Sequence, residues 1–234
     1  MAEVIIVSGP TGSGKTTSLR NLNPDETFIV RCTNKSLPFA KAKSLYNAEK
    51  RNLATFKSAN ESNPVAGYIQ FADIVSILPS LSNVKTVVFD DFGMLMSDEF
   101  LSRSKEAGYT KFTDLSKHVN DAINMLKNLD LDIVIVLMYH DEIDGDEFNK
   151  VRKLSLMGRM TEDKCHPSRS VTYHLYTHTT FDKKDGKANY WFVTNTTKLD
   201  NIKIEAKSPI GVFEDILIPN DLDFVIKRIH EFES

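Results

Sequence analysis

Four short runs of apolar residues divide the chain. They cover residues 4–8, 27–32, 84–91 and 132–138, and β-branched side chains are frequent in each of them. A continuous apolar run of this length is typical of a strand that is buried on both faces. The pattern therefore predicts four strands in the interior of a sheet.

The segments between these runs carry helical signals. Apolar residues recur every three or four positions over 112–129, which predicts a helix with one buried stripe. Further helices are expected over 16–22 and 72–81, within 92–110, and from Pro38 in the basic stretch 34–60. Strands that alternate with helices predict an α/β fold, with a mostly parallel sheet and helices on both of its faces.

The last third of the chain changes character. Two β-rich runs, 171–181 and 188–195, flank the turn-forming residues 182–187 and predict an antiparallel hairpin. A short strand over 202–206 is expected to add to this hairpin, and Pro219-Asn220-Asp221 is expected to cap a closing helix that ends near Phe232. We interpret residues 1–234 as a single domain, in which 170–218 form a β-rich antiparallel C-terminal extension.

Composition and charge exclude several classes of protein. Of the 234 residues 41% are hydrophobic, which suits one core of ordinary size, and the formal net charge is −3. A case for nucleic-acid binding must therefore come from local patches. The two cysteines, Cys32 and Cys165, form no C-x-x-C pair, and no apolar stretch approaches the ~20 residues of a membrane span. We expect a cytoplasmic protein without a signal peptide or a membrane contact.

The first predicted strand leads into the most informative motif of the chain. Gly9-Pro10-Thr11-Gly12-Ser13-Gly14-Lys15-Thr16 matches G-x-x-x-x-G-K-[ST], and Thr17 follows in the predicted helix. The glycines let the backbone turn so that several N–H groups point at one anion, at the start of a helix. Lys15 is predicted to reach the β- and γ-phosphates, and the Thr16 hydroxyl to ligate Mg²⁺. Residues 9–17 thus predict a binding site for a nucleoside triphosphate, with ATP and Mg²⁺ as the expected cofactors.

The third apolar run ends in two carboxylates. Asp90 follows Val87-Val88-Phe89, the position from which a P-loop NTPase holds Mg²⁺ together with the phosphate-loop Thr. Asp91 is a candidate for orienting and deprotonating the attacking water, because a carboxylate can act as a general base. The alternative is that Asp91 caps the segment that follows it.

A third candidate site residue follows the fourth run. His140 stands in Met138-Tyr139-His140-Asp141-Glu142, just past the strand. If that strand lies between the first and the third, its end faces the γ-phosphate, and His140 could sense hydrolysis and signal to neighbouring loops. Glu142 is a weaker candidate for the catalytic carboxylate.

Two irregular segments combine basic and aromatic residues. Residues 145–170 are predicted to form a mobile loop, with basic side chains at Lys150, Arg152, Lys153, Arg159, Lys164 and Arg169. Such a loop could contact the phosphates of a polymer, place an Arg in a neighbouring subunit's site, or simply be solvated. Tyr109, Lys111 and Phe112 suit stacking on single-stranded bases, although Phe112 could equally be a core residue.

Several segments of the chain carry a resemblance to a known group of proteins. They are the phosphate loop, Val87-Val88-Phe89-Asp90, Met138-Tyr139-His140-Asp141-Glu142, Leu156-Met157-Gly158-Arg159-Met160, Ala206-Lys207-Ser208-Pro209-Ile210-Gly211-Val212-Phe213 and Ile218-Pro219-Asn220-Asp221-Leu222. In these segments the chain resembles small phage-encoded ATPases with a RecA-type core, related to the Sak-type single-strand annealing proteins. The resemblance covers nearly the whole chain, and its last two segments are more specific than the phosphate loop.

The resemblance implies more than the motifs do alone. It implies a RecA-like P-loop NTPase core whose sensor strand lies beside the phosphate-loop strand, and ATP hydrolysis at the subunit interfaces of a homo-oligomeric ring or filament. Lys207 matches a Lys that reaches the neighbour's γ-phosphate, although Ser208-Pro209 stand where an Arg is expected. Asp91 also departs from the small polar residue expected after the metal Asp.

The resemblance also implies a biological role. It suggests that the chain contacts single-stranded DNA through the loops near 92–112 and 145–170. The role is then recombination, annealing or replication in a phage-infected host's cytoplasm, with a single-strand DNA-binding protein as a further candidate partner.

Two other classes of function remain open from the sequence. A nucleotide or small-molecule kinase shares the phosphate loop, and Arg152, Arg159 and Arg169 could form its lid. The long gap between the third and fourth strands and the β-rich tail do not suit a compact kinase. A nucleotide-gated interaction module, which binds ATP without turnover, is the third hypothesis.

Overall fold

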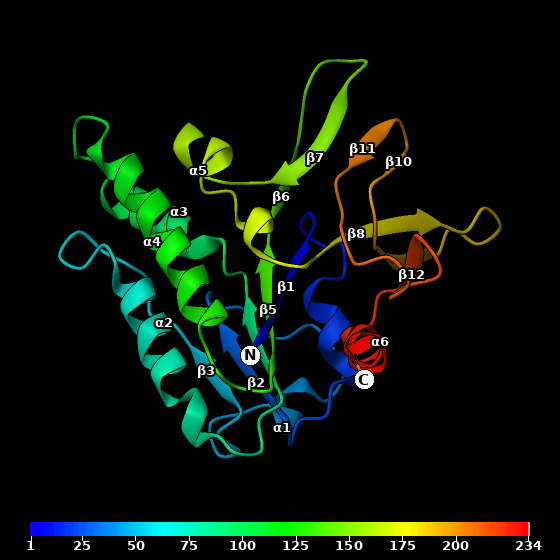
Figure 1. The fold of residues 1–234 in the computed structure, drawn as a ribbon, viewed down its shortest axis with the longest axis horizontal. Helices are drawn as coiled ribbons and strands as arrows, with labels where there is room; N and C mark the ends of the chain where they lie inside the picture. The colour runs from blue at the N-terminus through cyan, green and yellow to red at the C-terminus, as the bar shows by residue number, and fades with distance from the viewer. Residues whose placement is uncertain (234) are drawn as a thin grey trace.

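An eight-stranded sheet forms the centre of the computed structural model, which describes residues 1–233 (Figure 1). Its strand order is β12-β9-β8-β1-β5-β4-β2-β3, and all pairs from β8 to β3 are parallel, whereas β9 and β12 are antiparallel. The strands are β1 (Glu3–Ser8), β2 (Thr27–Arg31), β3 (Leu53–Thr55), β4 (Thr86–Asp90), β5 (Val134–Tyr139), β8 (Tyr173–Phe181), β9 (Ala188–Val193) and β12 (Leu217–Pro219). The predicted α/β fold with a mostly parallel sheet is confirmed.

Helices cover both faces of this sheet (Figure 1). On one face lie α2 (Ala66–Ile77), α3 (Met94–Ser102) and α4 (Thr110–Lys127), and on the other lie the 3₁₀ helix η1 (Thr16–Asn21), α1 (Ala42–Leu45) and α6 (Leu222–Glu233). Neighbouring strand residues face opposite sides, so Ile6 and Phe89 join the first core while Ile5 and Val88 join the second. Both faces are apolar, which is why these strands read as continuous apolar runs.

The central strand order decides where the site forms. β5 lies between β1 and β4, so the sensor strand is beside the phosphate-loop strand, as expected. The carboxyl ends of all three strands therefore meet at one edge, where ligands bind in open α/β sheets. The condition placed on His140, that its strand lies between the first and third predicted strands, is therefore met. Strand order cannot be read from any one segment of the sequence.

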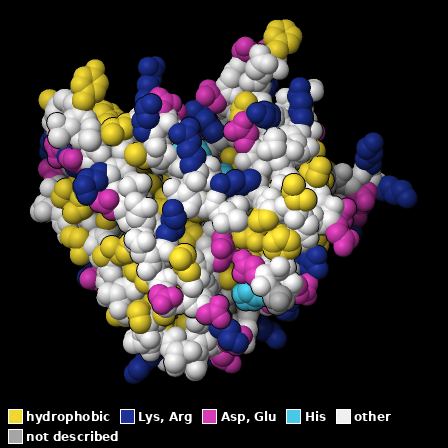
Figure 2. All heavy atoms as spheres, in the orientation of Figure 1, with side chains coloured by type: hydrophobic (Ala, Val, Ile, Leu, Met, Phe, Trp, Pro, Cys, Tyr) yellow, Lys and Arg dark blue, Asp and Glu magenta, His cyan; other side chains and the backbone are white. Residues whose placement is uncertain are grey.

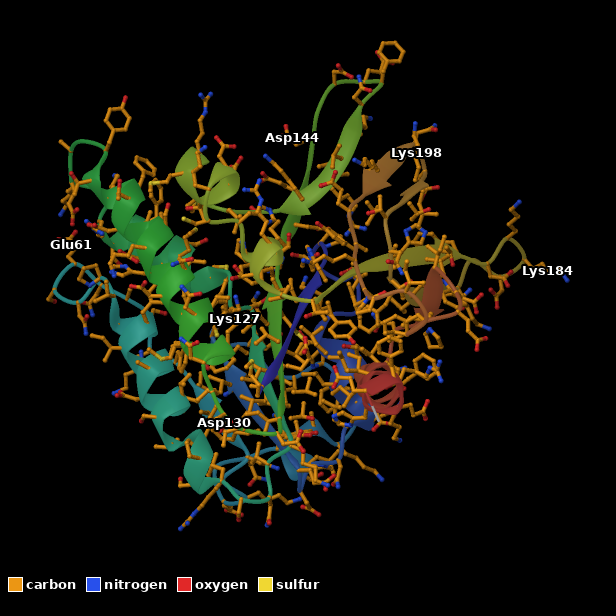
Figure 3. The ribbon with its side chains drawn as sticks, in the orientation of Figure 1. Glu61, Lys127, Asp130, Asp144, Lys184 and Lys198 are labelled. Atoms are coloured by element: carbon orange, nitrogen blue, oxygen red, sulfur yellow. The ribbon has the colours of Figure 1, made fainter. Side chains whose placement is uncertain are left out.

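A second, four-stranded sheet stands above this edge, in the order β10-β11-β7-β6. Its strands are β6 (Asp141–Asp144), β7 (Lys150–Leu154), β10 (Thr197–Leu199) and β11 (Ile202–Ile204). Figure 3 labels Asp144 in β6 and Lys198 in β10, on its two outer strands. The β6–β7 and β10–β11 pairs are antiparallel, and a parallel β11–β7 pairing joins them.

This second sheet corrects two predictions. Residues 145–170 are not one irregular loop, because they contain β7, the short helix α5 (Arg159–Asp163) and the 3₁₀ helix η3 (Pro167–Ser170). The strand predicted over 202–206 pairs with β10 and β7, and not with the β8–β9 hairpin. The second error has a clear cause, since β11 pairs with β7 about fifty positions away in sequence. The hairpin of β8 and β9 itself is confirmed.

Three helix predictions also need adjustment. The helix expected from Pro38 is a single turn, Ala42–Leu45, and the Asn52 side chain donates to the carbonyl of Leu45 at its end. The next helix begins at Ala66 and not at 72, and Gly67 in its first turn lies close to Leu95. The helix after the phosphate loop is 3₁₀. No helix among residues 1–233 is both long and apolar enough to cross a membrane.

Candidate nucleotide-binding site

The phosphate loop connects β1 to η1 in the conformation that its sequence predicts. Gly12 and Gly14 have φ angles of +78° and +90°, a region that favours glycine. Gly9 is needed for a different reason, because a Cβ there would lie 1.7 Å from Oγ1 of Thr177 in β8. Thr177 Oγ1 also donates to Ser13 Oγ over 2.7 Å, and Ser13 donates to the Pro10 carbonyl. Sequence reasoning missed Thr177, which fastens the loop to the neighbouring strand.

Lys15 lies beneath the loop and is buried. Its Nζ donates to the carbonyl oxygens of Gly9, over 2.6 Å, and of Pro10, over 3.0 Å. Burial lowers the pKa of Lys15, and the carboxylates of Asp91, Asp141 and Asp90 oppose that shift. The ammonium is thus held inside the loop, among three acidic side chains.

The two predicted metal ligands are in contact. Thr16 Oγ1 donates to Asp90 Oδ1 over 2.8 Å, although 74 positions separate the two residues in sequence. Burial, followed by the charge of Asp91, raises the pKa of Asp90 to about 6. A divalent cation at this point would favour the ionised carboxylate. Mg²⁺ is usually held by one or two side-chain oxygens together with substrate phosphates, so these two residues fit it.

Asp91 contacts three side chains, two from the segment after β2 and one from the end of β5. Its Oδ2 accepts from Thr33 Oγ1 (3.1 Å) and Lys35 Nζ (3.0 Å), and its Oδ1 lies 3.2 Å from His140 Nε2. Burial alone would raise the pKa of Asp91, but His140 and Lys35 outweigh it and hold the pKa well below its ordinary value of 3.8. Its backbone is left-handed, with φ of +59°. The sequence analysis missed Thr33 and Lys35, which follow β2.

His140 directly follows β5 and lines the same cleft as the phosphate loop and Asp91. The next residue, Asp141, pairs with Arg152 of β7 through a buried ion pair. Arg152 also donates from NH1 to the carbonyl oxygen of Thr177 over 2.8 Å. The second sheet is therefore tied both to the residue after His140 and to the strand that anchors the phosphate loop.

These groups line one cleft of about 200 Å³. Its walls are formed by Thr11, Gly12, Ser13, Lys15, Thr16, Lys35, Ser36, Pro38, Asp90, Asp91 and His140. The cleft gathers the predicted phosphate, metal and sensor residues at the carboxyl ends of three parallel strands. Thr17 faces away from it, into a second cavity on the other side of the loop.

Two other predicted residues lie outside the cleft. The backbone of Lys207 pairs with His174 in β8, with N–H to carbonyl distances of 2.9 Å in both directions. Its predicted role in a neighbouring subunit's site stays a prediction. Glu142 lies in β6, where Ser155 donates to it and Lys153 lies 3.6 Å away.

Above the cleft, Lys and Arg side chains gather between the α3–α4–α5 region and the β6–β7 hairpin (Figure 2). Two exposed aromatic residues flank this region: Tyr109, just before α4, is 89% exposed, and Phe148, in the β6–β7 turn, is 80% exposed. Phe112 instead packs against Phe100, with ring centroids 5.8 Å apart, which agrees with its core interpretation. Lys111 lies over both of these rings.

Comparison with known proteins gives limited information. No protein-family model matches the sequence, and no curated protein matches it. Among solved structures, the chain is similar to a KaiC-like protein from the hyperthermophilic archaeon Pyrococcus horikoshii, with a TM-score of 0.48 and 13% sequence identity. That likeness covers 82% of this chain and 77% of the other.

Proposed function

We propose that this chain is a RecA-like P-loop ATPase that binds ATP with Mg²⁺ in the cleft and hydrolyses it. The observation that carries the proposal is the 2.8 Å contact between Thr16 Oγ1 and Asp90 Oδ1, beside the buried ammonium of Lys15. A glycine-rich turn without a function would not need a cation-binding oxygen pair and a buried Lys at the same place. The phosphate loop and the strand end at Asp90, which are far apart in sequence, therefore meet in the fold.

The chain's own residues supply most of the chemistry. Backbone N–H groups of the loop and Lys15 would stabilise negative charge on the phosphates, because pre-placed donors act strongly where water is excluded. Mg²⁺, held by Thr16 and Asp90, would neutralise charge on the β- and γ-phosphate oxygens. His140 stands at the γ-phosphate end of the cleft, where it would contact the attacking water or the released phosphate.

Asp91 is better suited to hold other residues than to take a proton itself. Both of its oxygens already contact donors, and a depressed pKa makes a carboxylate a weak general base. We assign to Asp91 the role of orienting His140 towards the γ-phosphate, while Thr33 and Lys35 hold its other oxygen in place. Its direct action as the base requires one of the three donors to be released.

The proposal extends to single-stranded DNA and to assembly. The basic region between the two exposed aromatic residues, Tyr109 and Phe148, supports the DNA contact, because aromatic rings stack on bases and cations bind the backbone. Assembly into a ring or filament would let Lys207 act on a neighbour's nucleotide. Recombination, annealing or replication in a phage is the biological role we propose.

ATP turnover with and without a single-stranded oligonucleotide, at about 50 and about 200 mM salt, tests this function. We expect turnover that rises with the oligonucleotide at low salt. Tyr109→Ser and Phe148→Ser should each weaken DNA binding by about tenfold, since each ring stacks on one base. The matched control is Phe181→Ser, since Phe181 is another exposed ring, 69% exposed, in the β8–β9 hairpin, which lies away from the basic region.

The outcomes separate the parts of the proposal. Absence of turnover under every condition would contradict the ATPase, and absence of DNA binding at low salt would contradict the DNA role. The mass of the particle in solution, with and without a non-hydrolysable ATP analogue and the oligonucleotide, tests the assembly. A monomer in every case would remove the role of Lys207 between subunits.

A further inference from the structure

A second cavity, of about 470 Å³, lies on the other side of the phosphate loop. Gly12, Gly14, Thr17 and Arg20 form one wall, and Ala188, Asn189, Tyr190 and Asn220 form the other. Gly12 lines both this cavity and the charged cleft, so the loop backbone separates the two. In contrast to the cleft, the cavity wall contains one charged side chain, that of Arg20, and no carboxylate.

Asn220 is unusual among the residues of this wall. It is 3% exposed, yet neither Oδ1 nor Nδ2 of its side chain has a hydrogen-bond partner among the described residues. Its main chain is held firmly, because its N–H donates to the Tyr190 carbonyl (3.3 Å) and its carbonyl accepts from Arg20 NH1 (2.8 Å). An unpaired buried amide destabilises a protein, so this amide is more costly than an apolar residue of its size.

The ring of Tyr190 lies beside this amide. A Cβ on Gly14 would be 3.1 Å from both Tyr190 Cδ1 and Asn220 Oδ1, so the ring and the amide lie against the same point of the loop. Tyr190 is 44% exposed and belongs to none of the hydrophobic core clusters of the described residues. A turn of its ring towards solvent would uncover the amide and leave an aromatic face beside it.

The direction of a nucleotide on the loop points to the same cavity. The γ-phosphate belongs at the cleft, where Asp90, Asp91 and His140 converge. The α-phosphate and the nucleoside then leave the loop at its other side, past Thr17. A base on that path meets the ring of Tyr190 and the amide of Asn220.

We propose that this cavity is the nucleobase site, an inference that rests on the nucleotide binding proposed above, and that it selects adenine. An amide presents an acceptor and a donor side by side, which matches the N6 amino group and the N7 of adenine. The same edge of guanine offers two acceptors, N7 and O6, and leaves the amide oxygen unpaired. Guanine's N1–H and N2 donors would need an acceptor such as a carboxylate, and the wall has none. The Tyr190 ring stacks on the base.

Equilibrium binding of non-hydrolysable ATP, GTP and ITP analogues with Mg²⁺ tests the proposal, with inorganic tripolyphosphate as the ligand that lacks a base. The native chain should bind the ATP analogue about tenfold more tightly than the other two nucleotides, as one bidentate contact provides. Asn220→Leu should abolish that preference and should not lower the melting temperature, because the amide it removes is unpaired. Tyr190→Ala should weaken the binding of all three nucleotides by about tenfold but should not change the binding of tripolyphosphate. Tyr190→Phe should leave all of these affinities unchanged.

Each outcome decides between the two proposals. If the native chain binds neither nucleotides nor tripolyphosphate, the proposed function fails. If it binds nucleotides and tripolyphosphate equally, or if Asn220→Leu keeps the preference for adenine, the base site is wrong and the function stands. Should Asn220→Leu not fold, the ATP-to-ITP ratio of the native chain decides, since ITP replaces the N6 amino group by an oxygen: equal binding overturns the site.

Discussion

The phosphate loop separates two sides that differ in chemistry. The charged side contains Asp90, Asp91, Lys35 and His140, and these groups contact one another or the loop. The other side, called the neutral side here, contains Thr177, His174, Asn220 and Tyr190, which lie in or beside β8, β9 and α6, and its one charged wall residue is Arg20. The difference indicates a division of work: charge is placed where phosphate chemistry occurs, and uncharged groups hold the loop and face the base.

The charged side is expected to give the largest effect when it is changed. Asp90→Asn keeps the shape of the residue but removes the charge that Mg²⁺ needs. We expect ATP turnover to fall about 100-fold or more. The measurement is steady-state phosphate release at saturating ATP, and Asp130→Asn, an exposed carboxylate near the N-terminus, is the matched control. Turnover within a few-fold of the native value would remove the metal role of Asp90.

Charging the neutral side tests the comparison from the other direction. His174 Nε2 lies 2.9 Å from Ser8 Oγ in a fully buried position, and burial lowers the pKa of His174 from 6.5 to about 3. The unfolded chain therefore binds a proton below pH 6.5 that the folded chain does not bind. The unfolding free energy that depends on neutral His174 is therefore fully present above pH 6.5, and it is lost as the pH falls from 6.5 towards 3.

At about pH 4.5 this effect should cost about 2–3 kcal/mol of unfolding free energy. Urea unfolding of the native chain and of His174→Gln, near neutral pH and near pH 4.5, checks it. Carboxylates common to both proteins cancel in the comparison. We expect His174→Gln to lose about 2–3 kcal/mol less than the native chain on acidification, and an equal loss in both would show that His174 does not stay neutral.

Two glycines of the loop test the anchoring on the neutral side. Gly9→Ala places a methyl group 1.7 Å from Thr177 Oγ1 and should destabilise the fold by about 1–3 kcal/mol. Gly12→Ala meets no atom within 4 Å, and its positive φ alone should cost about 1 kcal/mol. Thermal unfolding measures both variants. Adding Thr177→Ala should partly restore the thermal stability of Gly9→Ala but not that of Gly12→Ala. If both double variants behave alike, Thr177 is not the anchor of the loop.

The smallest effect is expected at the exposed end of the charged side. Lys35 donates to Asp91 over 3.0 Å, but its side chain is mostly exposed, and such pairs contribute about 0–1 kcal/mol. Lys35→Met should lower turnover by a few-fold at most and leave the melting temperature unchanged. A loss as large as that of Asp90→Asn would mean that Lys35 itself contacts the γ-phosphate.

The sequence by itself determined the local features of this protein. The central strands β1, β2, β4 and β5 were readable as apolar runs, because burial on both faces favours apolar residues at most positions. The phosphate loop was readable because its backbone conformation requires glycines at fixed spacing. Asp90 and His140 were readable because each ends such a run.

The tertiary structure alone decided which residues meet. The sequence contains no local signal for the order of strands, so it could not show that Thr33 and Lys35 reach Asp91, or that Thr177 holds Ser13. The pairing that joins the two hairpins of the second sheet was missed for the same reason, since β7 and β11 pair across about fifty positions. Asn220 reads in sequence as part of a helix cap, and its buried, unpaired amide beside the loop exists only in the fold. Long-range strand pairing depends on the packing of the whole sheet, and no single segment of the sequence contains that information.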